Sequence, residues 1–411
     1  MTERTGGALR VGIIGGSLAG CAMAVALSQV GCDVTVFERS GEGMRDRGSG
    51  IGLPRDLVTV LRDRGLLDAD MPTEWIDRKL WIRTDPGDAE RGETVWTQTP
   101  FNVSGNNWNL IWDNLRRRVP DERYRAATEV VGIEPRTDGV GIELADGERA
   151  AFDLLVAADG NRSSTRSRFF PDAVEDYTGY VLWRGWYDGA DVPDEESIAN
   201  LLTTVVFDHG HFNCWLVPGP TGSAPGSRQL AWILYDNLRD APFVDSMRGP
   251  DGTLKQVPQG GCTPEQVEYI HGVARDKFPG YYADLVLRDP RPLIFPLYDI
   301  RLSSYRHGRV VVAGDAGTTV TPMTGSGATK GLGDALALAD AIAEEPSLEA
   351  ALERYDAARP AVGGGLADMG LRIGELLVEN PPDWTTMDQA QIKAAWEGVL
   401  TETPYFYQAQ D

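Results

Sequence analysis

A strand, a glycine-rich turn, a helix and a second strand follow one another between Arg10 and Glu38, and this βαβ unit constrains the fold more than any other part of the chain. A turn of this kind brings backbone N–H groups against a pyrophosphate. The second strand ends at Glu38, an acid placed to accept hydrogen bonds from a ribose diol. A glycine-rich turn alone can be merely structural, but the ordered set predicts an adenine dinucleotide site for FAD or NAD(P). The turn consists of Gly15, Gly16, Ser17, Leu18, Ala19 and Gly20, with Ser17 in place of the usual second glycine.

Two later segments have a similar character and predict a larger parallel sheet. Leu154 to Asp159 and Arg309 to Asp315 are apolar runs that end in an aspartate, and an Ala-rich helix is expected from Gly331 to Ala343. Between them the pattern changes to short alternating strands rich in Trp and Tyr, which is typical of an antiparallel sheet. The sequence therefore predicts an α/β protein with three parts: a discontinuous Rossmann-like nucleotide-binding domain (1–172 and 301–360), an inserted, mostly antiparallel β-sheet substrate domain (173–300) and C-terminal helices (361–411).

The charge balance limits the partners that this chain can bind. Its 411 residues include 39 Lys and Arg against 61 Asp and Glu, a formal net charge of −22, which argues against nucleic acid or anionic lipid as a partner. The first ten residues are polar, and no apolar stretch approaches bilayer length, so neither a signal peptide nor a membrane span is expected. The four cysteines lack CxxC or metal-ligand spacing. We expect a cytoplasmic enzyme that binds small molecules and no metal.

Three motifs, in this order along the chain, resemble those of the class A flavoprotein monooxygenases, the family of 4-hydroxybenzoate hydroxylase. They are the turn from Gly15 to Gly20 with Glu38, the stretch DGNRSSTR from Asp159 to Arg166, and the stretch GDAGTTVTP from Gly314 to Pro322. The sequence WRG at Trp183 to Gly185 is most similar to the 2,6-dihydroxypyridine 3-hydroxylase branch. This resemblance spans most of the chain. It implies non-covalently bound FAD, with NADPH or NADH as a transient co-substrate.

The resemblance also assigns residues to the FAD. It implies that the glycine-rich turn, Glu38 and Arg39 hold the ADP half, and that Asp315 after Gly314 bonds the ribityl chain. Backbone N–H groups beside the flavin ring would stabilise negative charge on the reduced flavin. The residues implied near the pyrophosphate are Asp159, Gly160 and Arg166, and those implied beside the ring are Pro322, Gly325, Gly327 and Ala328.

In two places the sequence departs from the pattern of the family. Gly317 and Thr318 replace the last two residues of the frequent GDAAH motif, so any role of that histidine is absent. Trp112 takes the position of a flavin-contacting arginine found in many relatives, with Arg116 or Arg117 as a possible substitute. Arg47 lies in a stretch, RGSGIG, that resembles the mobile segment over the flavin, and it is a further expected contact.

The resemblance implies the chemistry as well. Reduced flavin and O2 would give a C4a-hydroperoxide, whose distal oxygen attacks an electron-rich aromatic or N-heteroaromatic carbon. The protein would have to exclude water and orient the substrate. Alternation puts Arg184 on one strand face with Tyr180 and Leu182, so Arg184 is a candidate to bind a phenolate, carboxylate or oxo group, with a surface ion pair as an equal alternative.

The remaining substrate-site candidates come from the same sheet. His211 shares a strand face with Asn213 and Trp215 and is a candidate base, although a lone histidine is more often structural. Tryptophan at strand spacing is likewise more often core than ligand contact. The expected pocket walls are Trp183, Trp215, Trp232, Phe295 and Pro322.

Two other functions fit the same motifs. FAD with the same oxygen chemistry can serve epoxidation or Baeyer–Villiger oxidation, which product analysis would distinguish from hydroxylation. A non-catalytic flavin-binding protein would show no substrate-stimulated NAD(P)H oxidation. The sequence decides neither NADH against NADPH nor a monomer against a homodimer.

Overall fold

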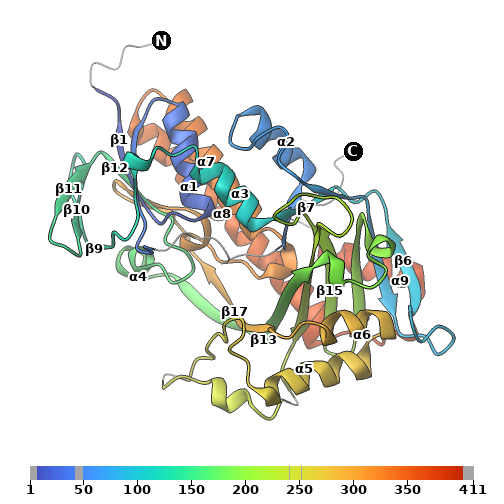
Figure 1. Cartoon of the computed structure of the whole chain (residues 1–411). Coiled ribbons are helices and arrows are strands. Elements are labelled where there is room, and N and C mark those ends of the chain that lie inside the picture. Colours follow the sequence, from blue (N-terminus) through green and yellow to red (C-terminus); the bar gives the residue numbers. More distant parts are fainter. Residues whose placement is uncertain (1–6, 42–49, 240, 251, 401–411) are drawn as a thin grey trace.

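The computed structural model describes residues 7–41, 50–239, 241–250 and 252–400, and Figure 1 shows how their helices and strands are arranged. The three segments predicted to share a sheet do so. They lie in a six-stranded sheet of order β18-β19-β12-β1-β2-β8, in which β1 pairs in parallel with β2 and β12, and β12 with β19. The strands are β1 (Arg10–Ile14), β2 (Asp33–Phe37), β8 (Tyr124–Arg125), β12 (Leu154–Ala157), β18 (Arg306–His307) and β19 (Val310–Val312).

Helices pack beside this sheet, and the first of them is largely apolar. The first helix packs against both α7 and α3 (Figure 1). Gly31 follows the first helix and has a φ of +87°, a left-handed conformation that a glycine adopts without strain. The helices are α1 (Leu18–Gln29), α2 (Arg55–Asp63), α3 (Trp108–Arg116), α4 (Ser164–Phe169), α7 (Gly327–Glu344) and α8 (Leu348–Gly374).

A seven-stranded sheet forms the second large layer, with the order β17-β13-β16-β15-β14-β5-β6. Its pairs are antiparallel except for β14 with β5, which confirms the predicted mostly antiparallel sheet. Two of its strands precede residue 100, so the sheet extends beyond the predicted 173–300 insertion, and the division into domains stays a prediction. The strands are β5 (Arg78–Arg83), β6 (Glu93–Gln98), β13 (Val174–Asp188), β14 (Leu201–Phe207), β15 (Gly210–Val217), β16 (Gln229–Asp236) and β17 (Leu293–Arg301).

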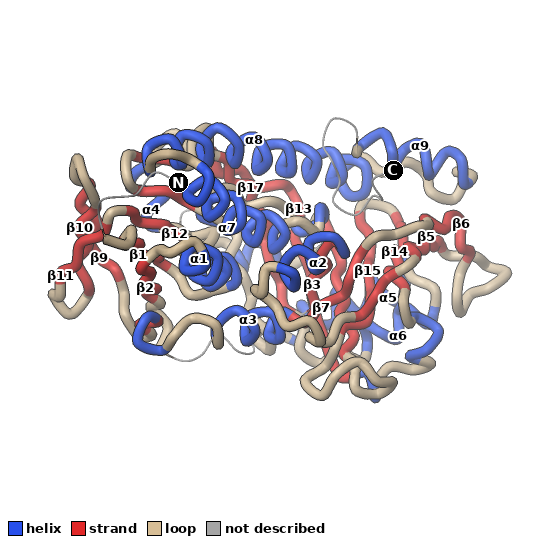
Figure 2. Tube along the Cα trace, turned by 90° about the horizontal axis from the view of Figure 1, so that it is seen from above, coloured by secondary structure: helices blue, strands red, loops and turns tan. Residues whose placement is uncertain are grey.

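Helices cover parts of both faces of this second sheet. On one face, α5 (Pro264–Lys277) and α6 (Gly280–Leu287) supply Ile270 and Leu285 to a buried cluster. On the other, α8 and α9 (Gln389–Val399) supply Leu366 and Trp396 to a second cluster. Figure 2 shows α8 running from the parallel sheet to the seven-stranded sheet. This helix passes through Pro360 without ending, so the predicted start of a separate helical segment at residue 361 falls inside α8.

Two small sheets and short helical turns complete the described chain. The sheet with the order β3-β7-β4 contacts the seven-stranded sheet and α7, and therefore lies between the two large layers. Its strands are β3 (Gly50–Pro54), β4 (Glu74–Ile76) and β7 (Val103–Asn107); the other small sheet contains β9 (Val130–Pro135), β10 (Val140–Leu144) and β11 (Arg149–Phe152). Short 3-10 turns span Asp121–Arg123, Gly189–Asp191, Glu195–Ile198, Val244–Met247, Gly314–Ala316 and Pro322–Thr324, and a π turn, Glu375–Glu379, follows α8.

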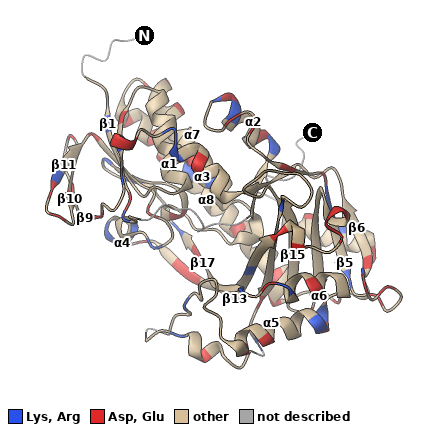
Figure 3. Ribbon diagram, in the orientation of Figure 1, with Lys and Arg blue, Asp and Glu red and all other residues tan. Residues whose placement is uncertain are grey.

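Figure 3 marks the positions of the charged residues along the ribbon. In the view of Figure 3, acidic and basic positions are interspersed on α2, α5 and α6, whereas α1 and α7 are mostly uncharged. In the described part of the chain, none of the helices combines the length and the apolarity that crossing a membrane requires.

Candidate functional site

The glycine-rich turn connects β1 to α1 and has no room for side chains at two of its glycines. A Cβ on Gly15, whose φ is +100°, would lie 2.3 Å from the carbonyl oxygen of Ala158. A Cβ on Gly20 would lie 1.9 Å from the carbonyl oxygen of Gly15. Ser17 begins α1 without capping it through its side chain. The N–H groups at this helix start therefore suit an anion such as a pyrophosphate.

Glu38 holds the turn in place from the end of β2. Its Oε2 accepts a hydrogen bond from the Gly16 N–H at 2.7 Å, and its Oε1 accepts one from the Ser40 N–H at 2.8 Å. Both carboxylate oxygens thus bind backbone, and each keeps a lone pair for a further donor. Glu38 can therefore hold the turn and also accept the predicted hydrogen bonds from a ribose.

A cavity of about 310 Å³ brings the first two predicted motifs together. The fold joins them because β1, β2 and β12 are neighbours whose carboxyl ends meet at one edge of the sheet. A phosphate-accepting helix start and two acids at one rim fit the ADP half of FAD. The residues lining it include Gly15, Ser17, Glu38, Arg39, Asp159 and Gly160.

Arg166 connects the second and third motifs. It lies in α4, and its guanidinium donates to the carbonyl oxygens of Asn161, Asp315 and Ala316. Burial lowers its pKa from the ordinary arginine value. Because these donors bind backbone oxygens, Arg166 holds two loops together, and its contact with the cofactor stays a prediction.

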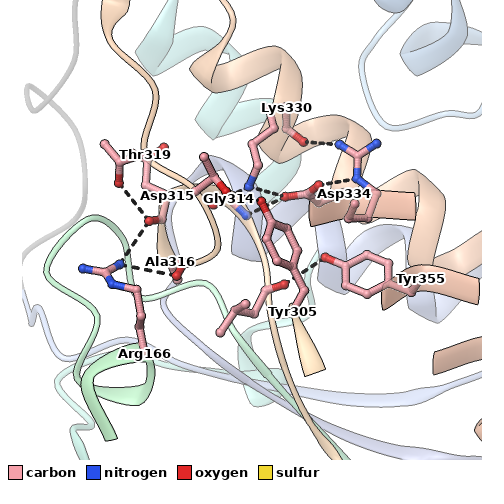
Figure 4. A network of polar contacts seen from close by, with 12 residues as sticks. Arg166, Tyr305, Gly314, Asp315, Ala316, Thr319, Lys330, Asp334 and Tyr355 are labelled. Atoms are coloured by element: carbon pink, nitrogen blue, oxygen red, sulfur yellow. Dashed lines mark hydrogen bonds and ion pairs between the residues drawn. The ribbon is translucent and has the colours of Figure 1, made fainter. Parts of the chain in front are cut away.

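A buried network, which the sequence did not reveal, clamps the loop after β19 (Figure 4). The Gly314 N–H donates to Asp334 Oδ2 at 2.8 Å, and Lys330 Nζ donates to the Gly314 carbonyl oxygen at 2.6 Å. Lys330 and Asp334 also form an ion pair of 3.0 Å, and Arg359 Nε binds Asp334 Oδ1 at 2.5 Å. The lysine and the aspartate are fully buried. The network fixes the backbone on which Asp315 stands.

A second cavity, of about 350 Å³, lies between the parallel sheet and the seven-stranded sheet, and we call it the flavin cavity. Asp315 faces it: the side chain is accessible through the cavity, yet desolvation raises the pKa of its carboxyl. The start of α7 also opens into it, beside Gly325 with a φ of +63°. Predicted cofactor residues on its wall are Ser17, Leu18, Ala19, Gly160, Gly314, Asp315, Pro322, Gly325, Gly327 and Ala328.

Trp112, the residue at the position of the relatives' arginine, does not line the flavin cavity. Its Nε1 donates to the Gly16 carbonyl oxygen at 2.9 Å, behind the glycine-rich turn. Trp108, one helical turn earlier, stacks on Trp112 with 6.4 Å between centroids and lines the flavin cavity instead. Arg116 and Arg117 are paired with Asp121 and Asp68, and neither lines this cavity. Arg47 lies outside the described residues.

The seven-stranded sheet forms the opposite wall of the flavin cavity. Arg184 lies there, and its guanidinium donates to the Gly50 carbonyl oxygen at 3.1 Å. Burial lowers the pKa of Arg184 to about 10. The alternative of a surface ion pair is therefore wrong. Trp215 also lines the cavity, whereas Phe295 lines an adjoining one of about 390 Å³ together with Asp315 and Pro322.

Trp183 and Trp232 do not line the pocket, which corrects the prediction for these two side chains. Trp183 packs against Phe243 and Tyr269, and Trp232 Nε1 donates to Asp289, all on the face that α5 covers. Side chains alternate along a strand, so neighbours of Arg184 and Ile233 necessarily point to the other face.

His211 is buried beside the pocket without reaching it. Its ring stacks on Tyr235 at 4.5 Å, and it lines neither the flavin cavity nor the cavities of about 310 and 390 Å³. Burial, and secondarily the nearby Lys79 charge, lower the pKa of His211 well below its ordinary value. The prediction that His211 contacts the substrate as a base is thus not supported by its position. Within the described residues, His, Cys, Asp and Glu form no cluster suited to a metal ion.

Comparison with known proteins agrees with this geometry. A family model described as FAD binding domain matches residues 8–175 and 292–369, and one described as FAD binding domain-like matches residues 177–299. The chain belongs to the FAD binding domain family, and its class is that of the class A flavoprotein monooxygenases.

Individual relatives narrow the comparison. The 2,6-dihydroxypyridine 3-monooxygenase of Paenarthrobacter nicotinovorans is 27% identical over 84% of this chain and 86% of its own. The salicylate hydroxylase of Pseudomonas putida is 26% identical over 85% of this chain and 81% of its own. The solved structure of 2,6-dihydroxypyridine-3-hydroxylase from Arthrobacter nicotinovorans superposes with a TM-score of 0.79 at 25% identity, covering 91% of this chain and 94% of the other.

Gly20→Ala is expected to abolish FAD retention, because the added methyl group would collide with the Gly15 carbonyl oxygen and open the turn. FAD absorbance per mole of purified protein measures the effect. Gly272→Ala is the matched control: Gly272 lies in α5, where a Cβ meets nothing within 4 Å, so FAD content should be unchanged. A fully flavinylated Gly20→Ala protein would contradict the placement of the dinucleotide.

Proposed function

We propose that the protein uses FAD, NADPH or NADH, and O2 to hydroxylate an electron-rich aromatic or N-heteroaromatic small molecule. One observation carries the proposal. The flavin cavity has the residues of the FAD motifs on one wall and, on the facing wall, an apolar sheet surface of Leu182, Trp215 and Ile233 with Arg184 as its charged residue. A planar ring with one polar substituent is complementary to that facing wall.

When bound, FAD would supply the oxidation chemistry by taking electrons from NAD(P)H and passing them to O2. The residues of the chain perform the remaining tasks. Asp315 accepts hydrogen bonds from hydroxyl groups, and the N–H groups at the start of α7 stabilise negative charge. The apolar wall keeps water from the reacting atoms, and Arg184 orients an anionic or carbonyl oxygen of the ring substrate.

The direct test measures NADPH and NADH consumption by the FAD-loaded protein with phenols, hydroxypyridines and hydroxybenzoates. We expect at least one ring compound to accelerate consumption, and mass spectrometry to show a product with one additional oxygen atom. An FAD-loaded protein whose NAD(P)H oxidation responds to none of these compounds would overturn the proposal. A product of epoxidation or ring expansion would indicate that the protein carries out epoxidation or Baeyer–Villiger oxidation instead of hydroxylation.

Arg184→Met should lower kcat/KM for the best ring substrate about tenfold to a hundredfold, because a charged hydrogen bond contributes roughly 1.5–3 kcal/mol. Steady-state kinetics on protein of known FAD content provide the measurement. The matched control is Arg288→Met, since Arg288 lies at the end of α6 and pairs there with Asp284. Unchanged kcat/KM in Arg184→Met would remove Arg184 from the substrate site.

A further inference from the structure

A smaller cavity, of about 100 Å³, continues the flavin cavity along the seven-stranded sheet, and we call it the inner cavity. The two cavities share Gly52, Trp215, Ile233, Pro322 and Gly325, so a molecule beside Arg184 can extend into both. Lys79 of β5 lines the inner cavity. It pairs with Leu202, which in turn pairs with Trp215, so the lysine lies in the same row of the sheet as a wall residue of the flavin cavity.

Lys79 is a buried amine that has no acidic partner in the part of the chain that the structure describes. It is 5% exposed, and burial is the one influence on its charge among these residues. The Nζ lies 4.3 Å from the ring centroids of both Trp81 and Trp396. Cation–π contacts offset only part of the cost of removing an ammonium from water, and burial accordingly lowers the pKa of Lys79 to about 7. An anion brought into the inner cavity would stabilise the charged form.

Two more residues with side-chain N–H groups line the inner cavity. The Asn213 side chain lines the inner cavity, and because its Oδ1 accepts a hydrogen bond from the Thr204 hydroxyl at 2.5 Å, its amide N–H groups remain for a ligand. Trp215 Nε1 is buried without a hydrogen-bond partner among the described residues. The residues that line this cavity include no aspartate or glutamate. Hydrogen-bond donors and a positive charge thus line the same cavity, which suits a ligand that carries a negatively charged acceptor.

We propose that Lys79 binds a negatively charged oxygen of the substrate in the inner cavity, with Asn213 and Trp215 as neighbouring donors. The oxygen belongs to a carboxylate or to an ionised ring hydroxyl. The inference rests on the proposed function and narrows its substrates to anionic aromatic molecules. The role of Lys79 is separate from that of Arg184, because Lys79 lines the inner cavity and Arg184 lines the flavin cavity.

The test compares anionic and neutral probes of the same shape by calorimetric binding to FAD-loaded protein. Benzoate is paired with benzamide, and ionised 4-nitrophenol with 4-nitroanisole. We expect the wild type to prefer the anion in at least one pair. Lys79→Met, which keeps the length of the side chain without its charge, should weaken binding of that anion at least about tenfold and leave the neutral partner unchanged. Lys393→Met, an exposed lysine on α9, should retain the wild-type preference.

The two probe pairs also identify the oxygen. Loss of preference for benzoate alone indicates a carboxylate, and loss for 4-nitrophenolate alone indicates an ionised hydroxyl. A wild type that binds neither anion, or a Lys79→Met protein that binds both as tightly as the wild type, overturns the inference.

Thermal unfolding separates ligand binding from a structural role of the lysine. Since Lys79→Met removes an unpaired buried charge, its melting temperature should equal or exceed that of the wild type. A lower melting temperature with weakened binding of every probe would show that the cation–π contacts serve stability and would overturn the inference. If Lys79→Met yields no folded protein, Lys79→Arg decides: it should keep the anion preference, and its loss there counts against the inference.

The proposed function and this inference fail in different ways. Preference for an anion that depends on Lys79, without NAD(P)H oxidation in response to any ring compound, would refute the hydroxylase and leave the anion site in place. Fast turnover of neutral ring compounds that Lys79→Met does not change would refute the anion site and leave the hydroxylase in place.

Discussion

Purified Asp315→Ala protein should be colourless, with FAD affinity reduced about a hundredfold or more. Asp315 is the carboxylate of the flavin cavity, held on a loop that Arg166 and the buried network fix from two sides. Each hydrogen bond from a ligand hydroxyl to a desolvated carboxylate contributes roughly 1.5–3 kcal/mol, so the loss of two such bonds is enough for this effect. Titration of the apoprotein with FAD, followed by flavin fluorescence, measures the affinity.

The loss should concern the ligand and not the fold. Desolvation raises the pKa of Asp315, and among the described residues no donor binds its carboxylate, so the fold gains no hydrogen bond from this side chain. The apoprotein of Asp315→Ala should therefore melt no lower than wild-type apoprotein. Asp315→Asn keeps one acceptor oxygen and should lose less affinity than the alanine variant. Recovery of fully yellow, active Asp315→Ala protein would contradict the assignment of this carboxylate to FAD.

Asp334→Ala should lower the free energy of unfolding by about 3–5 kcal/mol, the largest effect on stability that we expect from a single substitution. Asp334 accepts hydrogen bonds from the Gly314 N–H, Lys330 and Arg359, and its removal leaves an ammonium with 0% exposure and a guanidinium with 12% exposure without their anion. Urea unfolding of the apoprotein, analysed by linear extrapolation, gives the free energy directly.

Two further variants serve as controls for that measurement. Asp340→Ala lies on the same helix and breaks the half-exposed pair with Arg64, so it should cost less than about 1 kcal/mol. Lys330→Met combined with Asp334→Ala removes one isolated charge and should recover part of the lost stability. If Asp334→Ala costs no more than Asp340→Ala, the network does not clamp the loop as described.

The parallel sheet and the dinucleotide turn could be predicted because their signals are local. Gly15 needs a positive φ, Gly20 needs the absence of a Cβ, and Glu38 follows the second strand at the expected place. Each of these requirements can be recognised from a few neighbouring residues of the sequence. The structure joins the same segments through parallel pairing of β1 with β2 and β12.

The substrate wall was harder to predict for a physical reason. Alternation tells which residues of a strand share a face, but both faces of the seven-stranded sheet are buried, so aromatic side chains occur on both. Trp215 therefore lines the flavin cavity, whereas Trp183 and Trp232 pack under α5. Trp108 and Trp112 are related by one helical turn and share a face, and helical periodicity cannot tell which of them reaches the cavity.

The remaining site residues were not predicted, and for Lys79 the reason is a pairing of strands that lie far apart in the sequence. Lys79 reaches the inner cavity only because β5 pairs in parallel with β14, more than a hundred residues later in the chain. The ion pair of Lys330 with Asp334 has a spacing of four residues that can be recognised in the sequence, because residues at this spacing lie on the same face of a helix.

The mixed origin of the seven-stranded sheet limits how this enzyme can be re-engineered. In a chimera that receives residues 173–300 from a relative, the foreign β14 would have to pair with the native β5. The native register runs from Leu201 with Arg78 to Val205 with Ile82. Grafting the donor's hairpin for residues 78–98 together with the donor segment would avoid that junction, and it would also replace Lys79, the lysine that we assign to substrate recognition.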